Sequence, residues 1–418
     1  MSEVNFRQAI LVSIAENTAA VPECERSLDE LERLLHTAGG TCYAKVIQVK
    51  EKYDPRTCIG SGKVKEIKEL CEGGGIDLVI FDFELTPAQI RNIEDDIACE
   101  VDVVDRSMLI LDIFAQNAIS GEGKLQVQLA QLRYSAPRLV GKGTELSRQG
   151  GGIGSRGPGE SKLETDRRHV KEKISALEKK LAELEHTRMI MRAQRDKSGL
   201  PKVALVGYTN AGKSTLLNKL TDAGVLAQDK LFATLDPTTR KLTLPSGESV
   251  LLTDTVGFIR KLPHHLVKAF KSTLDEVRYA DILVVVADAS DPELDDQLAV
   301  TREVISELGA GDKPVIYAFN KCDAAETVAP KPDEECVAIS AKNGSGLDLL
   351  LERIEYRVKL SKRRCKLLVP YTEQGVVSAL YNSVTVNSVD YTDEGIVVDA
   401  VLDAKTMGQY AKYCLENE

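Results

Sequence analysis

The chain has 418 residues, 43% of them hydrophobic, and a formal net charge of −10. This length predicts two to four domains, and the negative charge excludes nucleic-acid binding through bulk charge, so any RNA contact requires a local basic patch. Nine cysteines without a CxxC pair indicate reduced thiols and exclude a disulfide framework, and no apolar run approaches the ~20 residues of a membrane span.

Residues 1–118 alternate strand-like apolar runs with amphipathic helical stretches. Repeated strand–helix units predict a parallel sheet covered by helices, so we expect a small N-terminal α/β domain. The start of the chain lacks a basic stretch and a cleavage site. We therefore expect a cytoplasmic protein, working as a monomer, with peripheral membrane association left open. The expected strands are Ala9–Ile14, Tyr43–Val49, Asp77–Phe83 and Glu100–Val104.

Two features of this domain admit a functional interpretation beside a structural one. Residues Ile59–Lys63 read IGSGK, but they lack the full spacing of a phosphate-binding loop, so we predict a tight turn before a helix. Asp82, Asp105 and Arg106 follow predicted strands. They either line a cleft or cap the neighbouring elements.

Residues 119–198 change character. A predicted helix over Gln126–Tyr134 is followed by the glycine-rich stretch Gln149–Gly159 and by a long helix from about Glu160. Apolar side chains in that helix are spaced by four and three residues, which is typical of a coiled-coil seam. We predict a helical hairpin formed with the earlier helix. The seam positions are Val170, Ile174, Leu177, Leu181 and Leu184.

Residues 199–362 predict a doubly wound, mostly parallel sheet with one antiparallel edge strand, the fold of a P-loop GTPase domain. Its predicted strands are Val203–Val206, Lys241–Leu244, Val250–Thr253, Ile282–Ala287, Val315–Phe319 and Cys336–Ile339. Residues 363–418 predict a small α+β domain with the order β-α-β-β-α. The whole chain is thus an α/β multidomain protein.

The most specific motif is a glycine loop between the first strand of this segment and a helix. Its glycines let backbone N–H groups approach phosphates, and the following helix N-terminus favours an anion. Lys213 is expected to reach the β- and γ-phosphates, and Ser214 to supply an oxygen to Mg²⁺. The phosphate-binding residues are Gly207, Tyr208, Thr209, Asn210, Ala211, Gly212, Lys213, Ser214 and Thr215.

Two switch segments follow this loop. In the first, Phe232–Asp236 (FATLD), we expect Thr234 to ligate Mg²⁺ when GTP is bound, in preference to Thr238 or Thr239. In the second, DTVGF, Asp254 would hold the metal through water and the Gly257 N–H would bond the γ-phosphate. Phe258 cannot orient the attacking water as a glutamine does, so we predict slow hydrolysis without a partner. The two segments are Phe232, Ala233, Thr234, Leu235 and Asp236, and Asp254, Thr255, Val256, Gly257 and Phe258.

Two later motifs select the base. The Asp323 carboxylate can accept hydrogen bonds from two donors of guanine that adenine lacks, and groups left unpaired by the wrong base give the discrimination. The stem of Lys321 is expected to pack on the ring, Asn320 to brace the glycine loop, and Ala341 N–H to bond the guanine oxygen. The motifs are Asn320, Lys321, Cys322 and Asp323, then Ser340, Ala341 and Lys342.

Further segments resemble the HflX family of translational GTPases over essentially residues 8–360. The resemblance is carried by RQGGGIGSRGPGESKLETDRR, VDRSMLILDIFA, LQVQLAQLRY, FATLDPTTR and DTVGF. It implies a cytoplasmic, magnesium-dependent GTPase that binds the large ribosomal subunit, splits or rescues stalled ribosomes under stress, and is stimulated by ribosomes. Phe258 agrees with the family pattern.

The stretch around the glycine-rich segment is locally basic. Residues 148–198 contain 13 Lys or Arg against 8 Asp or Glu, and arginines there could contact phosphates or stack on bases. A solvated helix with a flexible linker explains the same charges, so only the family resemblance favours ribosomal RNA. The candidates are Arg148, Arg156, Arg167 and Arg168.

Two other functions remain open on the residues alone. One is an RNA-remodelling protein with a second, ATP-using N-terminal domain. The other is a non-ribosomal regulatory scaffold gated by GTP. ATPase activity of clean protein discriminates the first, and dependence of ribosome binding on the four arginines discriminates the second.

Overall fold

The computed structural model describes residues 7–137, 158–197, 199–221, 231–232, 235–261, 271–324, 335–360 and 362–415. Contacts between residues divide the chain into two units. The first unit comprises Met1–Glu185, Ala227–Asp236 and Val256–Leu274, and the second comprises His186–Leu226, Pro237–Thr255 and Asp275–Glu418. Two short pieces of the predicted GTPase segment thus group with the N-terminal part of the chain, and the four-segment division of the sequence stays a prediction.

The first unit contains a four-stranded sheet of spatial order β2-β1-β3-β4, in which all neighbouring strands are parallel. Parallel neighbours require crossover connections, which the intervening helices provide. This arrangement confirms the predicted parallel α/β fold. In chain order the elements are β1 (Gln8–Ala15), η1 (Thr18–Ala20), α1 (Val21–Thr37), β2 (Thr41–Val49), α2 (Ser61–Gly74), β3 (Leu78–Phe81), α3 (Pro87–Ile97), β4 (Asp102–Asp105) and α4 (Arg106–Asn117).

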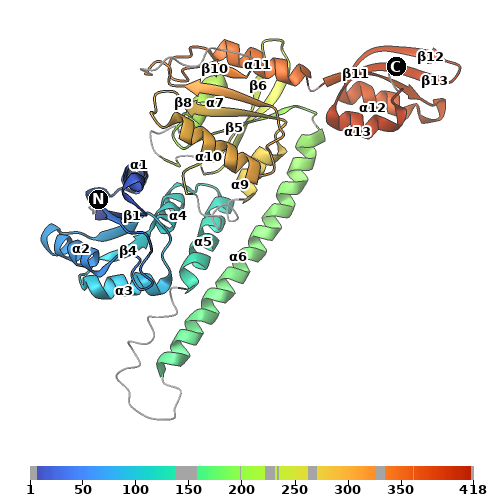
Figure 1. Cartoon of the computed structure of the whole chain (residues 1–418). Helices are drawn as coiled ribbons and strands as arrows, with labels where there is room; N and C mark the ends of the chain where they lie inside the picture. The colour runs from blue at the N-terminus through green and yellow to red at the C-terminus, as the bar shows by residue number, and fades with distance from the viewer. Residues whose placement is uncertain are drawn as a thin grey trace, which may run out of the picture. The chain divides into compact units, whose positions relative to one another are not determined.

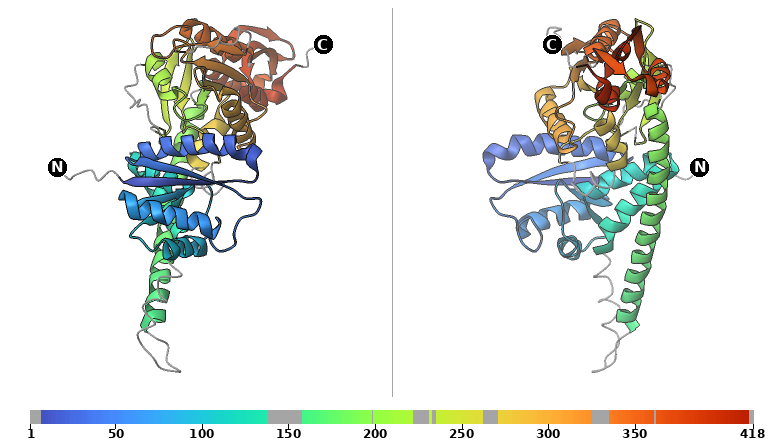
Figure 2. Two further views of the ribbon diagram at one scale, coloured as in Figure 1. Left: turned by 60° about the vertical axis from the view of Figure 1, so that its left-hand side comes forward. Right: turned by 90° about the vertical axis from the view of Figure 1, so that its right-hand side faces the viewer.

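Helices cover both faces of this sheet (Figure 2). Alternate residues of β1, such as Ile10 and Val12, pack in one buried cluster with Ile67 of α2 and Ile90 of α3. Helix α1 packs against β1 and β2. Because side chains alternate across a strand, β1 needs apolar residues at nearly every position to be buried on both faces. Its sequence, QAILVSIA, meets that requirement.

Two long helices complete the first part of the chain (Figure 1): α5 (Gly121–Ser135) and α6 (Pro158–Lys197). The predicted seam of α6 is confirmed at four of its five positions, because Val170, Ile174, Leu177 and Leu181 are less exposed than the residues around them, whereas Leu184 is 36% exposed. Arg133 of α5 forms a 2.7 Å ion pair with Glu178 of α6. Most of the predicted glycine-rich stretch lies outside the described residues.

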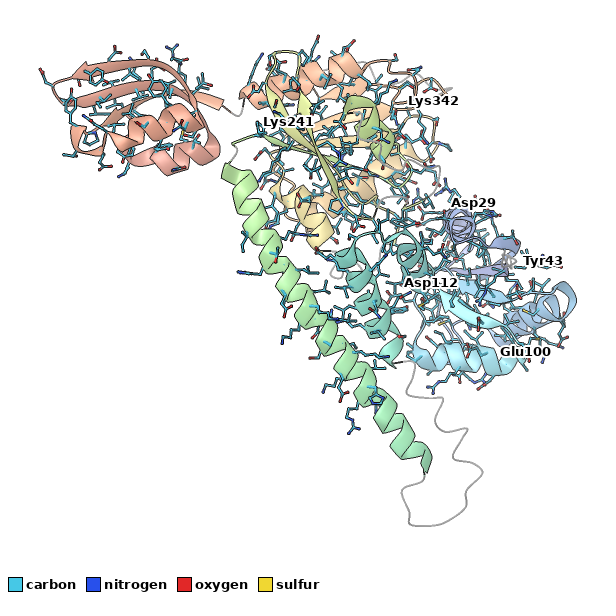
Figure 3. The ribbon with its side chains drawn as sticks, turned by 180° about the vertical axis from the view of Figure 1, so that it is seen from behind. Asp29, Tyr43, Glu100, Asp112, Lys241 and Lys342 are labelled. Carbon is cyan, nitrogen blue, oxygen red and sulfur yellow. The ribbon has the colours of Figure 1, made fainter. Side chains whose placement is uncertain are left out.

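Helix α5 is also tied to α4. The Gln131 side-chain amide donates a 3.0 Å hydrogen bond to the Asp112 carboxylate, which Figure 3 labels. Burial raises the pKa of the Asp112 carboxyl. Asp112 therefore fixes the angle between the two helices at the expense of partial desolvation of its charge.

The second unit contains a six-stranded sheet of order β10-β9-β8-β5-β7-β6. Only β6 runs antiparallel to its neighbour, β7, which confirms the predicted edge strand. The prediction of a doubly wound GTPase sheet is also confirmed. The elements are β5 (Lys202–Val206), α7 (Lys213–Thr221), β6 (Thr238–Thr243), β7 (Ser249–Asp254), α9 (Lys271–Tyr279), β8 (Ile282–Asp288), α10 (Leu294–Glu307), β9 (Val315–Asn320), β10 (Cys336–Ala338) and α11 (Leu347–Leu360).

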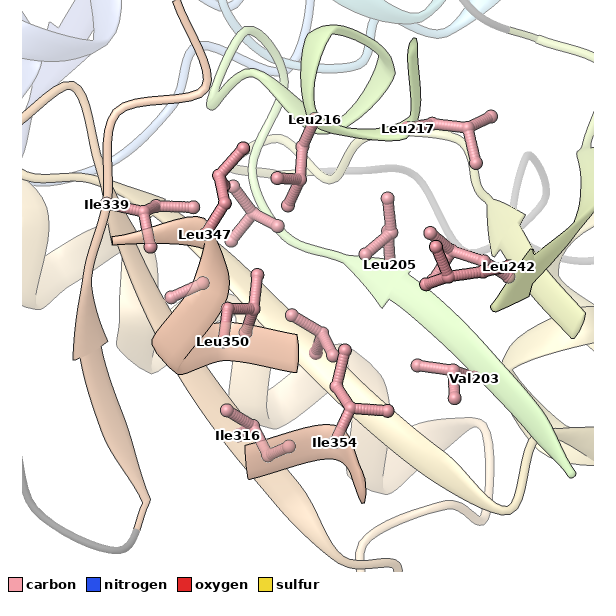
Figure 4. Packing of buried hydrophobic residues seen from close by; sticks show 14 of the residues in the cluster. Val203, Leu205, Leu216, Leu217, Leu242, Ile316, Ile339, Leu347, Leu350 and Ile354 are labelled. Carbon is pink, nitrogen blue, oxygen red and sulfur yellow. The ribbon is translucent and has the colours of Figure 1, made fainter. Parts of the chain in front are cut away.

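One face of this sheet packs against α7 and α11 (Figure 4). Leu216 and Leu350, one from each helix, are fully buried with Leu205 of β5 and Ile316 of β9. Helix α10 packs on β8. This core holds the carboxyl ends of the parallel strands in a fixed row, the edge at which α/β sheets bind ligands.

Residues 362–415 form a three-stranded antiparallel sheet of order β11-β13-β12 with helices on one face. The predicted β-α-β-β-α order is confirmed. Leu367, Val398 and Leu380 lie in its fully buried core. Its elements are β11 (Lys362–Val369), η3 (Tyr371–Glu373), α12 (Gly375–Ser383), β12 (Thr385–Thr392), β13 (Gly395–Asp403), α13 (Ala404–Tyr410) and η4 (Ala411–Tyr413).

Candidate functional site

The glycine loop lies between β5 and α7, where the sequence predicted it. Gly207 has φ +143° and Gly212 has φ +96°. A Cβ on Gly207 would lie 2.1 Å from the Val286 oxygen, and one on Gly212 would lie 2.2 Å from Asn320 Nδ2. Both positions therefore require glycine for a left-handed backbone and for close approach to neighbouring strands.

Lys213 begins α7 and is buried. Its ammonium donates to the Tyr208 carbonyl at 2.7 Å and to the Gly207 carbonyl at 3.1 Å. Burial lowers the pKa of Lys213 to about 8, while the Asp254 carboxylate acts in the opposite direction. The amine is thus held by loop carbonyls at the place where an anionic ligand would restore its full charge.

Two of the predicted metal ligands lie together. Ser214 Oγ donates a 2.6 Å hydrogen bond to Asp254 Oδ2, at the end of β7. No cluster of three acidic, histidine or cysteine side chains occurs in the part of the chain that the structure describes. Mg²⁺ usually takes only one or two protein ligands beside phosphates and waters, so the Ser214–Asp254 pair fits that ion.

Asn320 links the glycine loop to the predicted base-binding residues. Its side-chain amide donates to the Ala211 carbonyl at 2.8 Å, and its Oδ1 accepts from the Ala341 N–H at 2.8 Å. The side chain is buried. One residue thus fixes the distance between the two loops, and in this structure the Ala341 N–H braces Asn320.

Asp323 is exposed and oriented by Ser340. Ser340 Oγ donates a 2.6 Å hydrogen bond to Asp323 Oδ1, and this bond lowers the pKa of the Asp323 carboxyl. Ser340 Oγ also accepts from Asn343 N at 3.3 Å. The carboxylate is therefore ionised and directed by a partner that is itself held by its loop. Lys342, at the exposed end of this motif, is labelled in Figure 3.

Lys321 has a charged partner that sequence analysis missed. Its ammonium lies 2.6 Å from Asp288 Oδ2, and its backbone has φ +63°. Asp288 Oδ1 in turn accepts from Ser290 N and Ser290 Oγ, at 3.0 Å and 2.6 Å. The sequence shows only that Asp288 ends a buried strand. This position points to a contact with Lys321 once Asp288 is known to lie opposite Asn320 in the β8–β9 register.

Of the three threonines considered for the first switch, two lie in a strand. Thr238 pairs with Asp254, and Thr239 pairs with Thr253 in the β6–β7 ladder. Thr239 Oγ1 also lies 2.9 Å from Thr253 Oγ1. Thr234 and Ala233 lie outside the described residues, so the preference for Thr234 stays a prediction.

The described first-switch residues contact α4 and α5. Asp236 accepts hydrogen bonds from Ser120 N at 2.8 Å, from Ile119 N at 3.2 Å, and from Ser120 Oγ. Asn117 Nδ2 donates to the Phe232 carbonyl at 2.8 Å. The Phe232 ring meets Phe114 edge-on, with centroids 4.7 Å apart. This segment is thus packed on the start of α5, an arrangement no motif predicts.

The second switch ends with Phe258, which is fully buried. The residues that follow it contact the strand ends of the N-terminal sheet. Lys261 Nζ lies 2.7 Å from Asp82 Oδ2, and Arg106 donates to the Arg260 carbonyl at 3.2 Å. Arg106 also forms ion pairs with Asp82 and with Glu30. Asp82 and Arg106, two of the predicted strand-end residues, are buried and thus hold residues 260–261.

Asp105 is a structural cap, one of the alternatives left open by the sequence. Its Oδ1 accepts from Met108 N at the start of α4, and its Oδ2 accepts from Leu85 N and from the Tyr134 hydroxyl. Gly60 likewise precedes α2 as its N-cap, and its N–H donates to Gln48 Oε1. The predicted turn before a helix is therefore present at residues 59–63.

The four candidate RNA-binding arginines are only half described. Arg167 and Arg168 lie on α6 and are exposed, and the Arg168 guanidinium is 3.9 Å from Glu172. Arg148 and Arg156 lie outside the described residues. No helix in the described part of the chain has an apolar stretch long enough to cross a bilayer.

Three family models match consecutive parts of the chain. They are a GTP-binding GTPase N-terminal region at residues 25–115, a GTP-binding GTPase middle region at residues 117–195, and a 50S ribosome-binding GTPase at residues 202–321. Together they match most of the chain.

Curated relatives match nearly the full length. The chain is 48% identical over 404 residues to the GTPase HflX of Lacrimispora saccharolytica, covering 96% of this chain and 95% of the relative. It is 52% identical over 393 residues to the GTPase HflX of Caldanaerobacter subterraneus, covering 94% and 90%. A GTP-binding protein from Sulfolobus solfataricus, solved with GDP, aligns at 25% identity and a TM-score of 0.44, covering 85% of this chain and 100% of that one.

Proposed function

Since the chain belongs to the HflX family of GTPases and is a ribosome-associated GTP hydrolase, we propose that it is a magnesium-dependent switch acting on the large ribosomal subunit. In its GTP form it engages the subunit as a monomer, and it splits or rescues stalled ribosomes under stress. Because its partner is the ribosome, the protein acts in the cytoplasm.

The bridge formed by Asn320 is the observation that carries the nucleotide part of this proposal. It joins Ala211 of the glycine loop to Ala341 of the base loop through two 2.8 Å hydrogen bonds. Triphosphate and base can thus be bound in fixed register. In this arrangement Asp323 accepts the two guanine donors, Ala341 and Lys342 border the base, and Lys213 contacts the β- and γ-phosphates.

Residues of both switches complete the site. Ser214, Thr234 and Asp254 would hold Mg²⁺, which when bound neutralises charge on the β- and γ-phosphates. The Gly257 N–H donates to the γ-phosphate. Phe258 is fully buried and carries no polar atom in its side chain, so it does not orient the attacking water. Turnover by the isolated chain is therefore slow, and the ribosome accelerates it.

The contacts of the described switch residues suggest how nucleotide state is transmitted. Asp236 holds the first switch at the start of α5, and Lys261, three residues beyond the second switch, holds the chain there on the N-terminal sheet. Closing Thr234 and Gly257 around a γ-phosphate pulls on these same segments. GTP thereby biases α5 and α6, the helices on either side of the glycine-rich stretch, toward the conformation that engages ribosomal RNA.

Co-sedimentation with purified large subunits tests this proposal. We expect more protein to sediment with a non-hydrolysable GTP analogue than with GDP. Reversing four charges, at Arg148, Arg156, Arg167 and Arg168, should abolish sedimentation while GTP affinity is retained, because the arginines lie apart from the nucleotide motifs. Equal sedimentation with both nucleotides would contradict the switch.

A matched control separates local recognition from net charge. Lys65 on α2 and Lys241 on β6 are both exposed, and Lys65→Glu with Lys241→Glu makes the same change in net charge as Arg167→Glu with Arg168→Glu. We expect the lysine pair to leave sedimentation largely unchanged. Equal losses from both pairs would mean that the subunit repels any added negative charge.

A further inference from the structure

The sequence places Thr209 in the phosphate-binding glycine loop but assigns no role to its hydroxyl. Thr209 is 6% exposed, and its Oγ1 has no hydrogen-bond partner among the described residues. A buried hydroxyl without a partner is destabilising, so its retention requires an explanation, and a bound ligand is one.

The other buried threonines show what a structural hydroxyl does in this fold. Thr255 donates to the Leu205 carbonyl at 2.7 Å, and Thr301 to the Gln297 carbonyl at 2.8 Å. Thr57 donates to the Ile59 carbonyl at 2.8 Å, and Thr253 pairs with Thr239. All four buried threonines other than Thr209 in the described ranges are thus bonded to the protein itself.

The position of Thr209 is fixed by the loop. Gly207 and Gly212, on either side of it, are confined by the Val286 carbonyl and by the Asn320 side chain. The next residue, Asn210, adopts φ +61°, a left-handed conformation that asparagine tolerates better than most residues. The hydroxyl therefore has little freedom to find a protein partner by movement of the backbone.

The loop has a base end and a phosphate end, and Thr209 lies at the latter. Ala211 contacts Asn320, which also holds the base loop. At the other end, the Lys213 ammonium lies 2.7 Å from the carbonyl of Tyr208, the residue bonded to Thr209. A P-loop lysine reaches the β- and γ-phosphates, so the Tyr208–Thr209 peptide borders the terminal phosphates.

Resting on the nucleotide site of the proposed function, we propose that Thr209 Oγ1 donates a hydrogen bond to the terminal phosphoryl group of bound GTP. Thr209 is then a specificity-determining residue that distinguishes GTP from GDP, beside the switch residues that close over the same group. A neutral hydroxyl bonded to an anionic phosphate forms a charge-assisted hydrogen bond, and the buried site strengthens it.

Nucleotide affinities of Thr209→Val and Thr209→Ser test the proposal. Valine keeps the shape of threonine and removes the hydroxyl, whereas serine keeps the hydroxyl. For Thr209→Val we expect the Kd for a non-hydrolysable GTP analogue to rise about tenfold, with the Kd for GDP unchanged within about twofold. Thr209→Ser should retain most of the preference for the analogue.

Stability of the nucleotide-free protein provides the second measurement. Thr255→Val removes a bonded hydroxyl and should lower the Tm, whereas Thr209→Val should leave the Tm unchanged or raise it. A Tm loss for Thr209→Val as large as that for Thr255→Val would overturn the proposal, because the hydroxyl would then have a structural partner.

The remaining outcomes also test the proposed bond to the terminal phosphoryl group. Equal weakening of GDP and analogue binding by Thr209→Val would assign the hydroxyl to the inner phosphates or to loop shape. Unchanged binding with slower turnover would assign it to the attacking water. Either result overturns a bond to the terminal phosphoryl group, as does loss of the preference in Thr209→Ser.

Discussion

The residues predicted to hold the nucleotide differ from residues in or beside the predicted switches in the distance along the chain to the partners that they contact. Lys213 bonds to carbonyls five and six residues away, within its own loop. Asp236 and Lys261 contact residues 116 and 179 positions away, in the N-terminal part of the chain. We therefore expect short motifs to determine which ligand binds, and tertiary contacts to determine the response to it.

The largest effect is expected from Asp323→Asn, on the local side of this comparison. An amide accepts one hydrogen bond and donates another, so it no longer matches guanine but matches xanthine, which has a carbonyl in place of the amino group. We expect guanine nucleotide affinity to fall roughly 10²- to 10⁴-fold, since two bonds to a charged acceptor are lost. Competition between GDP and XDP for the variant measures the change, and an unaltered preference for GDP would contradict the role of Asp323.

Lys213→Ala should weaken binding of GDP and GTP about 100-fold, because one charge-assisted contact to phosphate is lost from a buried site. Calorimetry on nucleotide-free protein measures this loss. Lys219, six residues further along α7, is exposed and provides a control, and Lys219→Ala should bind both nucleotides normally. Unchanged nucleotide affinity of Lys213→Ala would contradict the role of the glycine loop in phosphate binding.

On the long-range side, Asn117→Ala removes the hydrogen bond from α4 to the Phe232 carbonyl without altering the switch sequence. Without this bond, less free energy is needed for the first switch to close over the γ-phosphate. Intrinsic GTP turnover should therefore rise roughly two- to tenfold, as expected for one neutral hydrogen bond. Single-turnover hydrolysis measures the effect.

Asn92→Ala is the matched control for Asn117→Ala. Asn92 Nδ2 also donates to a backbone carbonyl, that of Arg56, at 2.9 Å. Its partner belongs to no switch, so turnover should be unchanged. If both variants raise turnover equally, the gain reflects general loosening of the N-terminal domain and the contrast between local and long-range contacts fails.

Local motifs and periodicity allowed much of the fold to be predicted. The seam of α6 is present because a repeat of three and four residues places Val170, Ile174 and Leu177 on one face of any helix. The glycine loop was recognisable because its glycines, lysine and serine all lie in one short stretch of sequence, Gly207–Ser214. The antiparallel edge strand followed from the turn between Leu244 and Glu248, where the two residues share a 2.7 Å backbone hydrogen bond.

Contacts between distant elements were not predictable. Asp288 holds Lys321 only because β8 and β9 are adjacent and in register. Asp236 accepts from α5 only because the first switch packs on that helix. Asp288 lies in no motif, and the first-switch motif that contains Asp236 has no known spacing to Ser120, so no pattern in a single sequence identifies these contacts.

Asp288→Asn should sharpen the comparison with a smaller effect. Without a full negative charge at Asp288 the Lys321 stem is less firmly oriented toward the base, so GDP and GTP affinities should fall together by about threefold, the scale of a partly exposed ion pair. The rate constant of hydrolysis should not change. Ser290→Ala, which disturbs the turn but keeps the charge, should have a weaker effect, and a selective loss of GTP binding would contradict this role.

The smallest effect is expected in the C-terminal domain. It provides a reference because it contains neither the nucleotide-binding residues nor the switch residues. Hydrogen bonds from Arg364 lower the pKa of Asp399 from 3.8 to about 2. A carboxyl whose pKa is lower in the folded state stabilises the fold above pH 3.8 and loses that contribution as the pH falls toward 2. Amide exchange of β13 should therefore lose protection between pH 4 and pH 2, and less so in Arg364→Ala. Nucleotide should not alter this trend.

GTP turnover with and without purified large ribosomal subunits tests the central claim most directly. The isolated chain should hydrolyse GTP slowly, nearer the ~10⁻⁴ s⁻¹ of an unassisted Ras-type enzyme than 1 s⁻¹, and large subunits should accelerate it by at least about tenfold. Fast hydrolysis by the chain alone, or a rate that large subunits leave unchanged, would contradict the account.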